Sequence, residues 1–276
     1  MSVTTMSRDF EKRMELFKNN RVVNWHEHVS QTKNGTLNES SVERLIQSAK
    51  NTYTDAVVSS IPLLNYPCSP EEFCHANKVQ YEACKQCDML YGLAFVDVGF
   101  TKEAIKEIER CVYDYGFIGI KLYHQYFIDD PQQYPVIEKC IELDIPILVH
   151  AGYSPHLRES QPRLSGGQHF ANIARIYPEA NIIMAHIGGG GDWHWQIKAI
   201  ADSPSIVCDM SGSITDAPML EEAVAVLGAD RILFGTDASY EASIGKILSA
   251  NISEEDKKTI LAGTAYERFL KRRDAK

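Results

Sequence analysis

Short apolar runs alternate with amphipathic stretches along almost the whole chain. The apolar runs are rich in Val, Ile and Phe, and they are hydrophobic almost without interruption. This pattern is typical of strands that are buried on both faces of a parallel sheet. The predicted strands are RVVNW (21–25), DAVVS (55–59), LYGLAFV (90–96), FIGIKLY (117–123), IPILVH (145–150), NIIMAH (181–186), SIVCDM (205–210) and RILFGT (231–236).

Helical patterns separate these predicted strands. In residues 101–115, Ala104, Ile105 and Ile108 fall on one face of a helix that starts at Thr101. The same periodicity predicts further helices at 41–50, 132–143, 167–177, 193–201, 216–227 and 254–270.

Eight strands that alternate with helices predict an α/β fold, a (β/α)8 TIM barrel, with a doubly wound open sheet as the alternative. We assign residues 21–276 to this single barrel domain. A helical pattern at 8–19 lies outside the repeat, and we interpret residues 1–20 as an N-terminal helical extension. This extension either plugs the barrel bottom or joins a subunit contact.

Three stretches stand out between the predicted elements. The segments 60–80 and 152–167 are long connections, and long loops in compact domains are usually functional. The glycine run 188–191 lacks the pattern of a phosphate-binding loop. We interpret it as a strand-to-helix turn in which the backbone approaches a neighbour closely.

Potential metal ligands recur at the ends of the predicted strands. In a parallel barrel these ends converge on one mouth, where active sites are found. Imidazole and carboxylate bind zinc and neighbouring metals, so the pattern predicts a divalent metal, zinc first and manganese as the alternative. A set of ordinary buried core residues is the competing interpretation. The candidate ligands are His26, His28, Lys121, His150, His186 and Asp237.

The overall charge limits the classes of partner that this chain can bind. A net charge of −9 argues against nucleic acid and anionic membranes, which need dense Lys and Arg. The N-terminal residues carry charges throughout and resemble no signal peptide, and the apolar runs are too short to span a bilayer. Seven cysteines in no paired framework favour reduced thiols and a cytoplasmic location. We interpret the Cys84–Cys87 pair as ordinary thiols rather than as a metal site.

Several residues near the predicted mouth are candidates for binding a substrate. Arginine suits bidentate recognition of a carboxylate, so we expect a small molecule that bears a carboxylate. The alternative is that the arginines are solvated loop charges. Together with a metal ion, they would make the mouth locally positive on an acidic chain. The candidate substrate-binding residues are Arg158, Arg163, Tyr153, His156 and Tyr123, with His124 as a further wall residue.

The ordered motifs resemble those of the amidohydrolase superfamily, and most closely its amidohydrolase-2, decarboxylase-like branch. The resemblance spans about residues 21–270. The motifs are HEH at 26–28, GIKLY at 119–123, ILVHAG at 147–152, NIIMAHIGGG at 181–190 and ADRILFGTD at 229–237.

This resemblance implies roles for the candidate ligands. The HxH pair, His150 and Asp237 would hold a divalent ion, usually zinc. His186 would bind a second ion or contact the reacting water, and Lys121, when carboxylated, would bridge two ions. One ion and two ions remain equal alternatives. One position departs from the family pattern, since Asn24 stands where these enzymes commonly carry Asp.

The primary functional prediction is a hydrolase that cleaves a C–N or C–O bond of an amide, lactone or cyclic ester. Metal-activated water would attack, with Asp237 as general base and His186 orienting the water. The alternative is a non-oxidative decarboxylase of an aromatic or unsaturated acid, which the resemblance also implies. A non-catalytic metal-binding barrel is a third hypothesis. A homodimer is one option for the oligomeric state.

Overall fold

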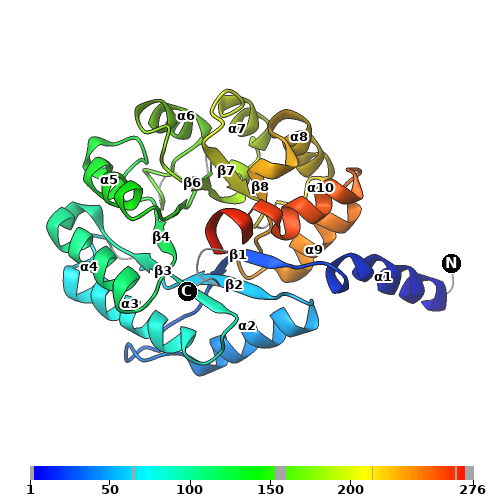
Figure 1. Cartoon of the computed structure of the whole chain (residues 1–276), viewed down its shortest axis with the longest axis horizontal. Coiled ribbons are helices and arrows are strands. Elements are labelled where there is room, and N and C mark those ends of the chain that lie inside the picture. The colour runs from blue at the N-terminus through cyan, green and yellow to red at the C-terminus, as the bar shows by residue number, and fades with distance from the viewer. Residues whose placement is uncertain (1–2, 64–65, 153–159, 213, 265, 271–276) are drawn as a thin grey trace.

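The computed structural model describes residues 3–63, 66–152, 160–212, 214–264 and 266–270. Figure 1 shows a ring of strands surrounded by helices. Neighbouring strands pair in parallel, and their order in the sheet follows the chain. The strands are β1 (Val23–His28), β2 (Ala56–Ser60), β3 (Leu90–Phe95), β4 (Gly119–Leu122), β5 (Ile147–Val149), β6 (Ile182–Met184), β7 (Ile206–Asp209) and β8 (Ile232–Leu233).

Backbone hydrogen bonds between the first strand and the segment after the last strand close the ring. The amide of Trp25 donates to the carbonyl of Phe234 at 2.8 Å, and the amide of Asp237 donates to the carbonyl of His26 at 2.8 Å. The predicted (β/α)8 barrel is therefore confirmed, and the open sheet is excluded.

Helices fill the connections between the strands. Their bounds are α1 (Val3–Lys18), α2 (Glu39–Asn51), α3 (Pro70–Cys84), α4 (Thr101–Tyr113), α5 (Tyr134–Glu142), α6 (Gly167–Ile176), α7 (Trp193–Ala199), α8 (Ala217–Leu227), α9 (Tyr240–Ser249) and α10 (Glu254–Lys258). Short 3-10 segments are η1 (Val98–Phe100), η2 (Pro131–Gln133), η4 (Ala185–Gly188) and η5 (Ala229–Arg231), and π-helical segments are η6 (Thr259–Gly263) and η7 (Tyr266–Leu270).

One helix lies where the sequence predicted only a long connection. Helix α3 occupies much of the segment 60–80, and it begins with a capping box in which the Ser69 hydroxyl accepts from the Glu72 amide at 3.3 Å. Pro70 occupies the first turn, where its missing N–H costs nothing. The long connection predicted for this segment is therefore in large part a helix.

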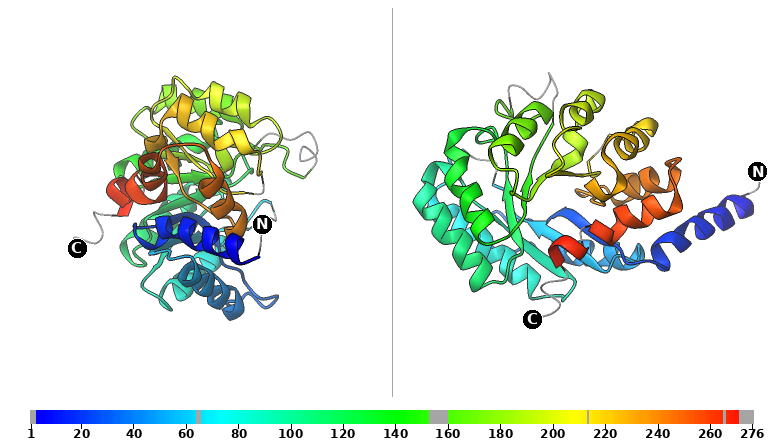
Figure 2. Two further views of the ribbon diagram at one scale, coloured as in Figure 1. Left: turned by 90° about the vertical axis from the view of Figure 1, so that its right-hand side faces the viewer. Right: turned by 45° about the horizontal axis from the view of Figure 1, so that its top comes forward.

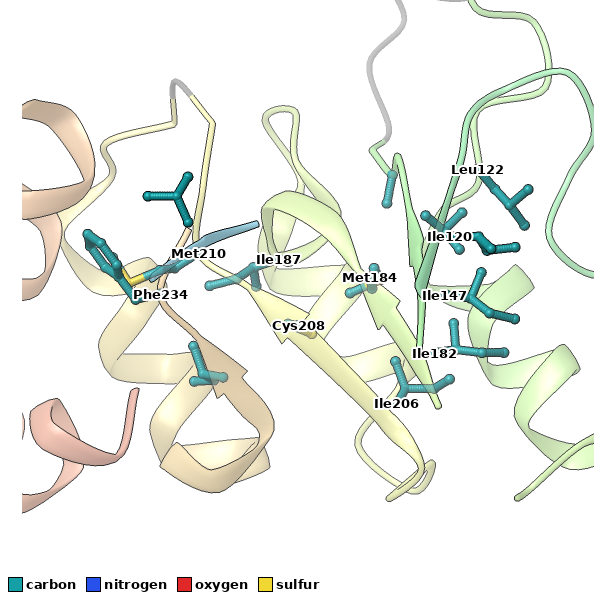
Figure 3. Close-up of a cluster of buried hydrophobic side chains, with 14 of the residues drawn as sticks. Ile120, Leu122, Ile147, Ile182, Met184, Ile187, Ile206, Cys208, Met210 and Phe234 are labelled. Atoms are coloured by element: carbon teal, nitrogen blue, oxygen red, sulfur yellow. The ribbon is translucent and has the colours of Figure 1, made fainter. Parts of the chain in front are cut away.

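Two apolar layers build the core. Alternate residues of each strand point outward toward the helices, and Figure 3 shows Ile120, Ile147 and Ile182 of this outer layer on neighbouring strands. The other residues point into the barrel. This inner layer comprises Val23, Trp25, Ala56, Val58, Leu93, Ile118, Leu148, Ile183, Ala185, Val207, Leu233, Ala262 and Leu270.

The C-terminal segment, rather than the N-terminal one, contacts the inner layer. Trp25 and Phe269 have ring centroids 5.0 Å apart, and Leu270 is buried in the same layer. Helix α1 runs outward from the barrel in Figures 1 and 2, and its end is held by Phe17, whose ring lies 5.7 Å from that of Phe234. Helix α1 therefore does not plug the barrel, and its role in a subunit contact stays a prediction.

A buried acidic side chain ties α3 to α4. Glu107 is 3% exposed, and its carboxylate accepts from Arg110 Nη2 at 2.6 Å, from Asn77 Nδ2 at 2.9 Å and from Cys74 Sγ at 3.1 Å. Burial alone would raise the pKa of Glu107, but these donors lower it below the ordinary value of 4.5. Folding therefore favours the ionised carboxylate.

We expect Glu107→Gln to lower the free energy of unfolding by about 2–3 kcal/mol at neutral pH, since a buried charged hydrogen-bond network is broken. Because the native pKa of Glu107 is lowered, its contribution is complete above pH 4.5 and is lost as the pH falls through the native pKa. Urea unfolding of wild type and variant, at neutral pH and in acid, measures the difference. A difference that stays constant in acid would contradict this account.

Candidate metal centre

The predicted ligands come from five strands and meet at the C-terminal mouth of the barrel. His26 and His28 lie within β1 rather than after it, which corrects the predicted end of that strand. Lys121 lies within β4. The other three follow their strands: His150 comes directly after β5, one residue separates His186 from β6, and three residues separate Asp237 from β8.

Three of these residues form the centre of the site. Ligand atoms of His26, His186 and Asp237 all lie within 4.8 Å of one another. Asp237 Oδ1 lies 3.8 Å from His26 Nε2, and its Oδ2 lies 3.8 Å from His186 Nε2. His28 adds a fourth group, since its Nε2 lies 3.2 Å from Asp237 Oδ1. The Asp237 carboxylate therefore faces three imidazole rings.

Lys121 and His150 flank this centre. Lys121 Nζ lies 2.8 Å from His26 Nε2, and His150 Nδ1 lies 3.2 Å from His186 Nε2. Burial lowers the pKa of Lys121 to about 8, against the opposite effect of Asp237 and Asp209. Both residues are near enough to take part in a one-ion or a two-ion site, and both alternatives remain open.

A buried carboxylate that the sequence interpretation missed contacts two of the histidines. Asp209, at the end of β7, is 0% exposed, and its Oδ2 lies 3.0 Å from His26 Nδ1. Its Oδ1 accepts from the backbone amides of His186 at 3.3 Å and Ser211 at 2.8 Å. Burial alone would raise the pKa of Asp209, but His26 and these contacts hold it well below its usual range. A proton on Nδ1 of His26 leaves Nε2 free to bind a metal.

The protonation states suit a divalent cation. Burial is the main cause that lowers the pKa of His26 to about 4, and it also lowers the pKa of His150 and His186. Burial alone would raise the pKa of Asp237, but the facing rings of His28, His26 and His186 hold it far below its usual range. Neutral imidazoles around an ionised carboxylate are the form in which these side chains bind divalent metals.

Two of the central groups stand on strained backbone. His186 has φ 62° and Asp237 has φ 48°, in the left-handed region that non-glycine residues rarely adopt. The glycine run after His186 turns the chain, and a Cβ on Gly188 would approach Gln196 Cβ to 2.5 Å. This close approach confirms the predicted turn. Strain of this kind persists where the surroundings determine it, and it clusters at functional sites.

The predicted substrate-binding residues differ in their surroundings. The Tyr123 ring stacks on His150 at a centroid distance of 4.4 Å, beside the centre. Arg163 is exposed, and its guanidinium donates to the carbonyl of Gln125 at 2.6 Å and lies over the Tyr126 ring. The predictions for Tyr153, His156 and Arg158 lie outside the described residues.

Two polar side chains on the same side of the centre retain unused hydrogen-bonding capacity. Tyr66 Oη and His124 Nδ1 are buried and have no hydrogen-bond partner among the described residues. The Tyr66 ring lies 5.1 Å from the His124 ring, and His124 lies 5.6 Å from the Tyr123 ring. The sequence indicates His124 but not Tyr66, whose only signal is its place in the long segment after β2.

A closed (β/α)8 barrel with a histidine and carboxylate cluster at its C-terminal mouth defines a barrel protein with a candidate divalent-metal centre. A family model described as Amidohydrolase matches residues 70–270, and the chain belongs to this family. The described residues contain no helix long and apolar enough to cross a bilayer.

Several curated proteins and solved structures that are similar to this chain are decarboxylases. Gamma-resorcylate decarboxylase of Polaromonas is 26% identical over 241 residues, which cover 68% of this chain and 72% of the relative. A 2,6-dihydroxybenzoate decarboxylase structure superposes with a TM-score of 0.70 at 20% identity, over 91% of this chain and 99% of that one. The dihydroxybenzoic acid decarboxylase structure from Polaromonas, which holds bound manganese, superposes with a TM-score of 0.67 at 20% identity. The match covers 91% of this chain and 97% of that one.

These findings correct the primary functional prediction. The hydrolase prediction is wrong, because the relatives with named activities reported above are decarboxylases. The alternative prediction, a metal-dependent decarboxylase, is the better supported one. A divalent metal is supported as well, but zinc in particular is not, since manganese is bound in the Polaromonas structure.

Proposed function

We propose that this protein is a metal-dependent, non-oxidative decarboxylase of a small aromatic acid, with manganese as its ion. The observation that carries the proposal is the 26% identity to gamma-resorcylate decarboxylase across 68% of the chain, combined with the ligand cluster at the barrel mouth. Manganese is supported by the Polaromonas structure that holds it, and the mixed imidazole and carboxylate donors accommodate manganese as well as zinc.

Decarboxylation sets clear tasks for the site. The bond between the ring carbon and the carboxylate breaks, its electron pair stays on the ring, and a proton must be added to that carbon. A divalent ion held by His26, His186 and Asp237 would supply positive charge that orients the acid and draws electron density from it. Asp237 has a second carboxylate oxygen beside the one that would hold the ion, so we assign it to holding and moving the proton, with His186 Nε2 3.8 Å from its Oδ2.

The aromatic side of the mouth is suited to the ring of such a substrate. The rings of Tyr123 and His124 lie next to His150, and the Tyr66 ring lies next to His124. The unpartnered atoms Tyr66 Oη and His124 Nδ1 would find partners in oxygen atoms of a substituted benzoate. A bound hydroxybenzoate would therefore relieve two buried polar groups that otherwise lack partners.

We expect Tyr66→Phe to raise KM for a hydroxybenzoate about 5-fold to 10-fold with a small change in kcat, since roughly one hydrogen bond of about 1 kcal/mol is lost. Steady-state kinetics with the manganese-loaded protein measure this. Tyr113→Phe is the matched control, because Tyr113 is 71% exposed. Equal KM values for Tyr66→Phe and wild type would remove Tyr66 from the substrate site.

The experiment that tests the function is a substrate panel. Manganese-loaded protein is incubated with 2,6-dihydroxybenzoate, other hydroxybenzoates and unsaturated dicarboxylic acids, and carbon dioxide is quantified against an enzyme-free sample. Release from at least one aromatic acid is the expected result. Turnover of amides or lactones without carbon dioxide release would refute the proposal.

The cellular location and the oligomeric state are two further proposals. A cytoplasmic location is supported by the seven cysteines, all of which lie within the described residues and none of which forms a disulfide. A homodimer is the second, and α1, which runs outward from the barrel, offers a surface for it.

A further inference from the structure

The turn that carries Asp237 is strained on two consecutive residues. Asp237 has φ 48° and Ala238 has φ 63°, and neither is glycine. The left-handed conformation is unfavourable for each such residue, because it brings the Cβ atom too close to the backbone. Other contacts must therefore hold the turn in place, and they determine where the Asp237 carboxylate points.

Glu27, the middle residue of the HEH motif, supplies these contacts. Its side chain is 3% exposed. Both carboxylate oxygens accept from the backbone amide of Ala238 at 3.2 Å, and Oε1 also accepts from the hydroxyl of Thr236. Oε2 accepts from the backbone amide of His28 at 3.3 Å. The Glu27 carboxylate on β1 therefore binds the residues on both sides of Asp237. It also binds the backbone amide of His28, which is itself a candidate metal ligand.

Asn24 completes the network from two residues earlier on β1. Its Oδ1 accepts from the Thr236 amide at 3.1 Å. Its Nδ2 donates to Thr236 Oγ1 at 2.7 Å and to Glu27 Oε1 at 3.4 Å. Asn24 is 0% exposed, so all of these contacts are sheltered from water. The three side chains form a cluster that contains a single carboxylate.

Asn24 stands where the amidohydrolase pattern carries Asp. The network explains why an amide suits this position better than a carboxylate. An Asp at this position would have no N–H to donate to Thr236 or Glu27. It would also place a second carboxylate within hydrogen-bond distance of Glu27, where two buried like charges repel. Asn at 24 is therefore the residue that matches a carboxylate at 27.

We propose that Asn24 and Glu27 are a matched pair of positioning residues, which clamp residues 236–238 and thereby set the Asp237 carboxylate for metal binding. The pair does not touch the substrate. The proposal rests on the proposed function only through the metal role of Asp237. Metal binding is measured here without substrate, so this proposal and the decarboxylase proposal fail separately.

The test uses Asn24→Asp, Glu27→Gln and the double variant. Each single change leaves the network with the wrong number of donors and acceptors. In the double variant, the side-chain amide introduced by Glu27→Gln can donate to the carboxylate introduced by Asn24→Asp and to Thr236 Oγ1. Its oxygen still accepts from the backbone amides of His28 and Ala238. Every donor in the network then has an acceptor again. The amide and the carboxylate have exchanged places, so the hydrogen bond between positions 24 and 27 runs in the opposite direction and the single negative charge lies at position 24.

We expect each single variant to weaken Mn²⁺ binding about 10-fold to 100-fold, as changes behind metal ligands usually do. The double variant should recover to within a few-fold of wild type. Titration of Mn²⁺ followed by electron paramagnetic resonance measures the affinity. Wild-type affinity in both single variants, or a double variant that loses the product of the two single effects, would overturn the proposal.

Two further variants separate positioning from stability. Glu107→Gln removes an equally buried carboxylate from the network with Arg110, so it should lower Tm while Mn²⁺ affinity stays unchanged. Thr236→Val removes only the hydroxyl link and keeps the side-chain shape, so it replaces Glu27→Gln if that variant does not fold. Reduced Tm with unchanged Mn²⁺ affinity in Thr236→Val would overturn the proposal.

Discussion

Asp237→Asn is expected to lower the rate of carbon dioxide release by about 10²-fold to 10⁴-fold, since it removes both a charged ligand and a proton carrier. The side chain keeps its size, but it loses the negative charge that faces His26, His28 and His186. The fold should survive, because the strands and the two apolar layers do not depend on this carboxylate. Initial rates with manganese-loaded protein at a saturating acid measure the effect.

Asp202→Asn is the matched control for this variant. Asp202 is exposed on the connection between α7 and β7, so its change should leave the rate within about 2-fold of wild type, as is usual for surface substitutions. Circular dichroism melting of both variants checks that they fold. A rate for Asp237→Asn that matches the control would remove Asp237 from the chemistry.

Removal of the metal is expected to abolish activity, because the buried histidines and carboxylate cannot supply the divalent charge by themselves. Dialysis against a chelator should reduce carbon dioxide release to the level of the enzyme-free sample. Adding Mn²⁺ back should restore the rate, and Zn²⁺ should restore less. Full activity in chelated, metal-free protein would contradict the metal site.

The metal content of the reactivated protein shows whether Lys121 takes part in a two-ion site. A ratio near one ion per chain would exclude the two-ion alternative, and a ratio near two would support it. Lys121→Met should leave a one-ion site filled but should lower the content of a two-ion site toward one. The distance of 2.8 Å between Lys121 Nζ and His26 Nε2 allows both outcomes.

Much of the fold could be predicted because the strands of a closed parallel barrel are hydrophobic almost without interruption. The ends of these strands also locate ligands, which is why His150, His186 and Asp237 could be found without a structure. Asp209 follows the same rule at the end of β7. A single acidic residue in a hydrophobic run has no partner at a ligand spacing, however, so the sequence did not mark it as part of the site. Its role depends on a contact with β1, far away in sequence.

The chemistry was harder to predict than the ligands. Hydrolysis and decarboxylation use the same imidazole and carboxylate donors, so residue types at strand ends cannot separate them. The groups that would separate the two reactions belong to the proposed substrate site, and one of them, Tyr66, comes from a segment without a periodic pattern. The contact between Glu27 and the turn at Asp237 could not be foreseen either, because it joins the first and last strands across the closure of the barrel.

Decarboxylation of the best acid of the panel in D₂O tests the central claim most directly. The account predicts that carbon dioxide is released and that the product carries one deuterium on the carbon that lost the carboxylate, as measured by mass spectrometry and nuclear magnetic resonance. A product that keeps its carboxylate, or that forms by cleavage with water, would contradict it.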